Sequence, residues 1–192
     1  LYIPTISVEG DGAVQPFGDN PFDDATVTEN TYLQLINNAE KYVWITTPYL
    51  IPDDSITDAL KTAAKAGIDV RIITPHIPDK KSVFEVTRSN YATLMESGVK
   101  IYEFTPGFIH SKMFLVDDEV CCIGTTNIDY RSLYLHFELS VMLYGCSSIK
   151  EIKRDFDRTL MLSREQTLQI VRKISLYTRL KRFVFKLFSP AL

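Results

Sequence analysis

The chain has 192 residues, of which 45% are hydrophobic and 23% are charged. This composition fits one globular domain with a full-sized core and excludes a disordered or fibrous segment. No apolar run reaches the roughly 18 residues that span a bilayer, and the first residues lack the basic-then-apolar pattern of a signal peptide. By itself the chain is expected to be soluble or peripheral.

The net charge of −3 conceals an uneven distribution along the chain. Residues 164–192 carry seven lysines and arginines against only Glu165, which gives +6, whereas the 14 basic and 23 acidic residues before them give −9. A basic end on an acidic body suggests an anionic surface as partner. The three cysteines have neither a disulfide framework nor a zinc spacing, so we interpret them as reduced core residues in a reducing compartment.

The first two thirds of the chain alternate between predicted helices and strands. Residues 5–24 are turn-rich and acidic without a helical period, which is typical of a loop. Apolar spacing predicts helices over 28–39, from Asp53 or Asp54 to Gly67, and over 82–97. β-rich runs predict strands at 42–47, 70–74 and 99–104. The resulting βαβαβ series indicates an α/β domain whose mixed, mostly parallel sheet is flanked by helices.

The last third predicts a hairpin followed by helices. Strands at 110–117 and 120–125 turn around Asp118 and Glu119, and 138–144 forms a further strand. Helices are expected at about 148–161 and 164–187. No linker or low-complexity run marks a second domain, so residues 1–192 are expected to form one domain that ends in a basic amphipathic helix at 164–192.

Two polar residues open the strand predicted at 110–117. Side chains two positions apart share one face of a strand, so His110 and Lys112 project together as a small cationic site. Asp117 has the opposite parity and points elsewhere. Its position therefore favours a structural task, such as anchoring the hairpin through hydrogen bonds.

The segment after the hairpin adds neutral polar groups. Gly124 lacks a side chain, which would let a ligand approach the backbone, and Thr125 and Asn127 supply hydroxyl and amide donors. Together with the imidazole and the ammonium, these groups suit a phosphate.

A histidine nucleophile needs an acceptor that holds its second ring nitrogen. Glu138 is a carboxylate within an otherwise apolar run and is the candidate for this role toward His110. The other two histidines, His76 and His136, have no lysine two residues later and are interpreted as structural or surface residues.

Six positions together resemble the signature of the phospholipase D superfamily, in which His-x-Lys is followed after four residues by Asp and after six more by Gly-Ser/Thr-x-Asn. They are His110, Lys112, Asp117, Gly124, Thr125 and Asn127, with threonine keeping the hydroxyl where serine is common. Stretches along most of the chain are similar to bacterial cardiolipin synthases: 47–52, 67–73, 87–89, 92–102, 127–132 and 187–190.

The resemblance implies transfer of a phosphatidyl group between two phosphatidylglycerols through a phosphohistidine, which yields cardiolipin and glycerol without a cofactor or a metal. It implies that His110, Lys112 and Asp117 are catalytic, that Lys112, Thr125 and Asn127 bind the substrate phosphate, and that Gly124 and Glu138 support them. Whether His110 is the nucleophile or the general acid stays open.

The family's active site takes two signatures, and this chain contains one that is similar to the C-terminal half of the full-length enzyme. The expected partner is therefore the N-terminal half or a second copy of the chain, at the bacterial cell membrane. A homodimeric nuclease of the same superfamily and an inert half that only completes the site are the alternatives. The −9 charge of residues 1–163 weighs against a nucleic acid partner.

The predicted C-terminal helix is amphipathic and allows two interpretations. Its apolar stripe either packs on the domain core or lies on anionic phospholipid, and exposed Phe183, Phe185 or Phe188 would favour the membrane. The stripe contains Ile170, Ile174, Tyr177, Leu180, Val184 and Leu187, opposite Arg172, Arg179, Arg182 and Lys186.

Overall fold

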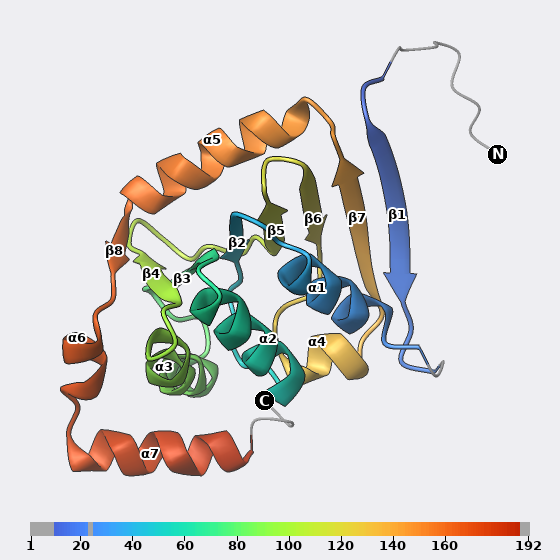
Figure 1. The fold of residues 1–192 in the computed structure, drawn as a ribbon. Coiled ribbons are helices and arrows are strands. Elements are labelled where there is room, and N and C mark those ends of the chain that lie inside the picture. Colours follow the sequence, from blue (N-terminus) through green and yellow to red (C-terminus); the bar gives the residue numbers. More distant parts are fainter. Residues whose placement is uncertain (1–9, 23–24, 189–192) are drawn as a thin grey trace.

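A computed structural model describes residues 10–22 and 25–188, which form one sheet flanked by helices (Figure 1). The strands are β1 (Ala13–Asp19), β2 (Tyr42–Thr46), β3 (Asp69–Pro75), β4 (Lys100–Phe104), β5 (Met113–Val116), β6 (Val120–Gly124), β7 (Glu138–Tyr144) and β8 (Ser163–Glu165). The helices are α1 (Val27–Asn37), α2 (Asp54–Lys65), α3 (Lys81–Met95), α4 (Tyr130–Tyr134), α5 (Ser148–Met161), α6 (Leu168–Arg172) and α7 (Leu176–Leu187). None of the helices in these ranges is long and apolar enough to cross a membrane.

The sheet has the strand order β1-β7-β6-β5-β2-β3-β4-β8. Only β2, β3 and β4 run parallel to one another, because helices connect them, and the remaining pairings are antiparallel. The predicted α/β class with a mixed sheet is confirmed. The expectation that most of the sheet is parallel was wrong, since the hairpin and the two edge strands bring in antiparallel pairs.

The central strand β2 is buried on both faces and separates two cores. Val43 and Ile45 pack toward α1, α2 and α3 in the larger core. Tyr42 and Trp44 point to the other face, where the Trp44 ring stacks on Phe156 of α5 with 5.1 Å between ring centroids. Because both faces of β2 are buried, successive residues of the strand are all hydrophobic up to Ile45.

The loop expected over 5–24 contains a strand. β1 pairs along its whole length with β7, so that Ala13 lies opposite Tyr144 and Asp19 opposite Glu138. Pro16 and Gly18 obscured this strand in the sequence, and they are tolerated because β1 lies at the edge of the sheet. Residues 5–9 and 23–24 of the predicted loop lie outside the described residues.

Local capping decides where helices begin and end. As predicted, Asp53 caps α2, since its side chain accepts a hydrogen bond of 2.8 Å from the Ile56 N–H, and Gly67 ends it with a φ of 97°.

The prediction of a single helix over 164–187 was wrong, because the segment forms β8, α6 and α7. Thr167 and Ser175 cap α6 and α7 with their hydroxyls, which interrupts the helical period.

The cysteines are core residues, as predicted. Cys121, Cys122 and Cys146 are all free and buried. Burial raises the pKa of Cys121 and of Cys122 to about 12, so both thiols stay protonated near neutral pH.

Candidate active site

Antiparallel pairing brings most of the predicted polar residues to one edge of the sheet, which we call the His110 edge: the end of β2, the start of β5, the end of β6 and the start of β7. Met113 pairs with Thr46 on one side and with Ile123 on the other, and Gly124 pairs with Ser140. The segment before β5 is tied to β2, because the Ser111 hydroxyl donates a hydrogen bond of 2.9 Å to Thr46 Oγ1.

His110 and Lys112 precede the strand, which begins at Met113 rather than at His110 as expected. The His110 side chain is exposed, and the nearest ring is that of Phe108, at 5.7 Å between centroids. Lys112 is buried, with 7% of its surface exposed, and its Nζ donates a hydrogen bond of 2.7 Å to the His110 carbonyl. Within the described residues no hydrogen bond holds the His110 ring.

The pKa values of His110 and Lys112 both lie below their ordinary values. Partial desolvation of the ring lowers the pKa of His110 although the side chain is exposed, and the nearby charge of Lys112 lowers it further, against a smaller opposing effect of Asp79. Burial also lowers the pKa of Lys112, whereas Glu138, Asp129 and Asp79 oppose this shift. An imidazole that loses its proton more readily than usual therefore stands beside a poorly solvated ammonium, which is an arrangement typical of functional sites.

Packing requires a glycine at position 124. A side chain at this position would meet neighbouring β7, because a Cβ atom would lie 2.0 Å from Ser140 Oγ and 2.7 Å from the Leu139 carbonyl oxygen. The glycine allows β6 and β7 to approach closely at the His110 edge. The expectation that Gly124 also lets a ligand approach the backbone stays a prediction.

Thr125 and Glu138 bind each other. The Thr125 hydroxyl donates a hydrogen bond to Glu138 Oε2 and accepts one of 3.0 Å from the Leu139 N–H. Glu138 was expected to hold the His110 ring, but no hydrogen bond connects the two within the described residues. The second Glu138 oxygen lies 3.7 Å from Nδ1 of His136, an exposed residue as predicted.

Asn127 lies at the same edge with an incompletely used side chain. Its Nδ2 donates a hydrogen bond of 3.0 Å to Ser132 Oγ, while its Oδ1 is buried and has no hydrogen-bond partner among the described residues. Asn127 also lines a pocket of about 130 Å³ together with Lys80, Arg131 and His136. Basic and amide groups therefore meet in one small depression.

Sequence reasoning missed residues that follow the parallel strands β2 and β3. Tyr49 comes after β2 and donates a hydrogen bond to Asp79, which comes after β3. Asp79 acts electrostatically on both His110 and Lys112. The available signal was topological, because the carboxyl ends of neighbouring parallel strands meet at one edge of a sheet.

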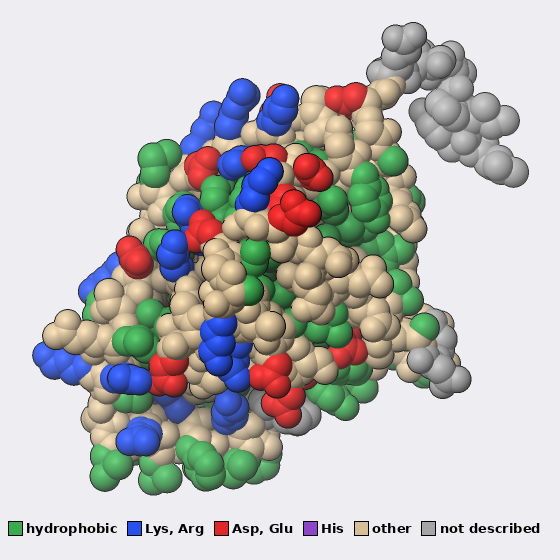
Figure 2. Space-filling model, viewed as in Figure 1, with side chains coloured by type: hydrophobic (Ala, Val, Ile, Leu, Met, Phe, Trp, Pro, Cys, Tyr) green, Lys and Arg blue, Asp and Glu red, His purple; other side chains and the backbone are tan. Residues whose placement is uncertain are grey.

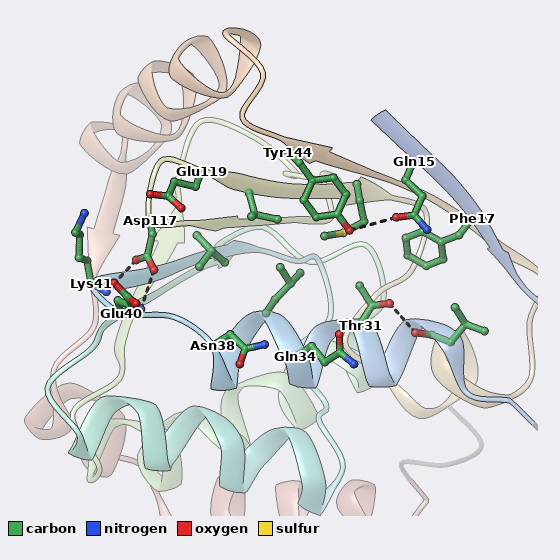
Figure 3. A pocket seen from close by; sticks show the side chains of 15 residues that line it. Gln15, Phe17, Thr31, Gln34, Asn38, Glu40, Lys41, Asp117, Glu119 and Tyr144 are labelled. Atoms are coloured by element: carbon green, nitrogen blue, oxygen red, sulfur yellow. Dashed lines mark hydrogen bonds between the residues drawn. The ribbon is translucent and has the colours of Figure 1, made fainter. Parts of the chain in front are cut away.

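Asp117 lies at the opposite end of β5, roughly 16 Å from Lys112 along a strand that rises about 3.3 Å per residue. Its carboxylate accepts hydrogen bonds of 2.7, 2.9 and 2.8 Å from the backbone N–H groups of Glu40, Lys41 and Tyr42. Figure 3 shows Asp117 beside Glu40 and Lys41, at one end of a pocket of about 520 Å³ between α1 and the sheet. The structure thus gives Asp117 the anchoring task that its parity indicated, and no contact with His110.

The turn that contains Asp117 begins one residue earlier than predicted. Asp117 and Asp118 have φ values of 55° and 65°, and the Glu119 N–H donates to the Val116 carbonyl at 3.0 Å. Val116 pairs with Val120, so the hairpin loop has three residues, and its two positive φ values are ones that aspartate tolerates. Asp117 therefore forms the turn and also holds the beginning of β2.

His76 is structural, as interpreted from the sequence. Its Nδ1 lies 2.8 Å from Oε2 of Glu103, which is buried and also accepts two hydrogen bonds from Arg88, at 2.8 and 2.7 Å. His76 thereby helps to neutralise a buried carboxylate on β4, away from the hairpin.

The described residues contain no group of three or more His, Cys, Asp or Glu side chains placed to share a metal ion. At the His110 edge the positive charge of the protein itself comes from Lys112, with Lys80 and Arg131 around Asn127.

Comparison with known proteins places this fold and this edge in a family. The family described as "Cardiolipin synthase, PLD-like domain" matches residues 32–160. Cardiolipin synthase 2 of Bacillus anthracis is 42% identical over the whole chain, and a cardiolipin synthase of Alkalihalophilus pseudofirmus is 41% identical over 98% of it. The chain spans 38% of the length of each of these relatives.

Solved structures agree with the fold. The phospholipase D family member Nuc from Salmonella typhimurium has a TM-score of 0.69 at 16% identity, over 81% of this chain and 99% of that one. Phosphatidylserine synthase from Haemophilus influenzae has a TM-score of 0.76 at 16% identity, over 97% of this chain and 49% of that one. With the family match covering most of its residues, the chain belongs to the cardiolipin synthase family of phospholipase D-like domains.

Proposed function

We propose that this chain is one catalytic half of a phosphatidyltransferase that converts two phosphatidylglycerols into cardiolipin and glycerol. The observation that carries the proposal is the pair at the His110 edge, where an exposed imidazole of lowered pKa stands next to a buried ammonium. The family membership and the relatives named as cardiolipin synthases support the substrate class.

The lowered pKa favours the nucleophilic role for His110. A neutral ring nitrogen attacks the phosphorus of the first phosphatidylglycerol, and the bond from phosphorus to the glycerol oxygen breaks. A protonated histidine of the other half supplies the proton that the leaving glycerol needs. A hydroxyl of the second phosphatidylglycerol then attacks the phosphohistidine, gives its proton to the same partner histidine, and releases cardiolipin.

Lys112 and Asn127 are proposed to hold the nonbridging phosphate oxygens. Lys112 supplies the charge, and Asn127 offers the N–H of Nδ2 that is not directed at Ser132. Thr125 is a third proposed ligand, and its hydroxyl would have to turn from Glu138 to donate to phosphate. Glu138 and Gly124 shape the edge around these groups. No cofactor or metal is assigned.

The proposal requires a second signature, because this chain contributes one His-x-Lys pair. The partner is proposed to be the remaining part of a longer protein, since the chain spans 38% of its cardiolipin synthase relatives. A second copy of the chain is the other arrangement that would supply two histidines.

Cardiolipin formation in phosphatidylglycerol vesicles tests the proposal. The complete protein in which the chain occurs should lose at least a thousandfold of its rate in the His110→Ala variant, because the covalent step disappears. His76→Ala serves as a control for loss of a histidine elsewhere. A His110→Ala enzyme that retains most of its rate would overturn the proposal, and activity of this chain alone would assign the second histidine to another copy.

A further inference from the structure

Helix α7 is turned the opposite way from an ordinary surface helix. Its basic side faces the domain: Lys181 and Arg182 bind Glu85 of α3 at 2.7 and 2.8 Å, and Lys186 binds the Asn90 side chain at 3.0 Å. Arg182 is buried. A helix stabilised only by contacts within a water-soluble domain would bury its apolar side instead.

The apolar side of α7 faces outward. Figure 2 shows hydrophobic side chains gathered along the lower edge of the molecule, where α7 lies in Figure 1. Most are more than half exposed, with Leu176 at 82% and Tyr177 at 75%, and they form a nearly continuous arc on one side of the helix. Its members are Leu176, Tyr177, Leu180, Phe183, Val184, Leu187 and Phe188.

A groove with positive charge adjoins this arc. It has a volume of about 560 Å³ between α3, α6 and α7, and Glu96 is the one carboxylate among the residues that line it. Glu96 is already paired with Arg172 at 2.6 Å. Two further lining residues, Arg179 and Lys186, have no carboxylate partner within the described part of the chain, and the groove ends at the aromatic ring of Phe183.

We infer that α7 lies in the surface of a membrane that contains anionic phospholipid, with a lipid phosphate in the groove beside Arg179 and Lys186. The exposed arc would enter the boundary between head groups and acyl chains, while Arg179 and Lys186, which have no carboxylate partner within the described residues, would meet the phosphates. The +6 charge of residues 164–192 matches such a surface. An ordinary aqueous surface would leave the apolar arc exposed to water.

The position of α7 connects this surface to the His110 edge. Phe185, on the inner side of α7, packs against Ile51 and Val83, and both of these residues also line the small pocket that contains Asn127. The inference deepens the proposed function, because the helix would hold the edge close to the lipid that supplies the substrate. Membrane binding can nevertheless be measured without turnover.

Cosedimentation of the chain with vesicles tests the inference. We expect binding to phosphatidylcholine vesicles that contain phosphatidylglycerol and equally to those that contain phosphatidylserine, with weaker binding to pure phosphatidylcholine. Leu180→Ser with Phe183→Ser should lower the partition coefficient at least tenfold on all vesicles. Arg179→Gln with Lys186→Gln should lower it roughly thirtyfold on anionic vesicles alone, since each cation near the surface contributes about fivefold.

Matched controls remove similar groups elsewhere. Met161→Ser with Leu162→Ser removes two exposed apolar side chains at the end of α5, and Lys150→Gln with Arg154→Gln removes two surface cations. Both controls should bind like the parent, and thermal unfolding should show that every variant is folded. Parent-like binding by the α7 variants, or equal losses in the controls, would overturn the inference.

Three other outcomes would also overturn it. The first is absence of binding to any vesicle. The second is binding to phosphatidylglycerol but not to phosphatidylserine, which would place the lipid in the catalytic site. Membrane binding by the His110→Ala chain is measured as well, because binding without turnover would distinguish failure of the proposed reaction from failure of the membrane inference. A dimer in light scattering that the Leu180 and Phe183 substitutions dissociate would show that a second copy covers the arc.

Discussion

The two ends of strand β5 carry parts of one sequence signature but have opposite physical characters. At the first end, the His110 ring is exposed and has no hydrogen bond among the described residues, and Lys112 is buried with a lowered pKa. At the other end, Asp117 accepts three backbone hydrogen bonds and forms a turn. Unused hydrogen-bonding capacity is found at the end where we propose a ligand site, whereas saturated capacity marks the end that holds the fold.

This difference shows that fixed spacing in a signature does not give every member the same task. The distance from Lys112 to Asp117 is set by the length of the strand, because Asp117 must reach the backbone at the start of β2. A substitution at each end should therefore affect a different measurable quantity, and three variants test this division.

The largest expected effect on stability is at Asp117. Asp117→Ala leaves the N–H groups of residues 40–42 without their acceptor and places alanine at positive φ, so we expect a loss of about 3 kcal/mol in the free energy of unfolding. Asp117→Asn keeps an acceptor oxygen and should lose about half as much. Urea unfolding of the chain measures both.

His110→Ala is the matched variant at the other end of β5. The side chain is exposed and its ring is unbonded within the described structure, so its stability should stay within about 0.5 kcal/mol of the parent. The division between the two ends fails if His110→Ala destabilises the chain as much as Asp117→Ala does.

A loss of stability smaller than that of Asp117→Ala is expected at Gly124, which packs against β7 at the His110 edge. Gly124→Ala forces a methyl group against Ser140 Oγ and the Leu139 carbonyl, and should cost about 1–3 kcal/mol of unfolding free energy. Adding Ser140→Gly removes the nearer contact and should recover part of the loss. A fully stable Gly124→Ala chain with weakened phosphate binding would instead support the ligand-access interpretation.

The sequence predicted the α/β class, the helices α1, α2, α3 and α5, and the group of polar residues at one edge. Those predictions succeed because hydrophobic period, caps and the spacing of the hairpin are local properties. It did not predict β1, whose pairing with β7 is a long-range contact that Pro16 and Gly18 disguise. It also could not place the Glu138 carboxylate, because whether that group reaches Thr125 or His110 depends on side-chain geometry rather than on spacing.

The same limit applies to the C-terminal segment. Amphipathic spacing identified a polar and an apolar side, but it left open whether the apolar side packs on the core or lies on phospholipid. The pairing of Lys181 and Arg182 with Glu85 reverses the orientation of α7. A carboxylate 96 residues away from Lys181 therefore decides which side of the helix meets its surroundings.

The smallest expected effect is a shift in the titration of His110. Its pKa lies below the ordinary value of 6.5, first because of burial and then because of the Lys112 charge. Lys112→Met removes that charge from a buried position with a similar volume, so the His110 pKa should rise, whereas Lys112→Arg should leave it low. Titration of the imidazole resonances by NMR in the chain measures the shift, with His76 and His136 as internal references.

The lowered pKa of His110 also has a consequence for stability. Because the unfolded state binds this proton more tightly, the contribution of His110 to stability is present above pH 6.5 and is lost as the pH falls toward its folded-state pKa. If nucleophilic attack needs the neutral ring, the acid limb of the transfer rate should move upward with Lys112→Met, and an unchanged limb would assign the proton-donating role to His110.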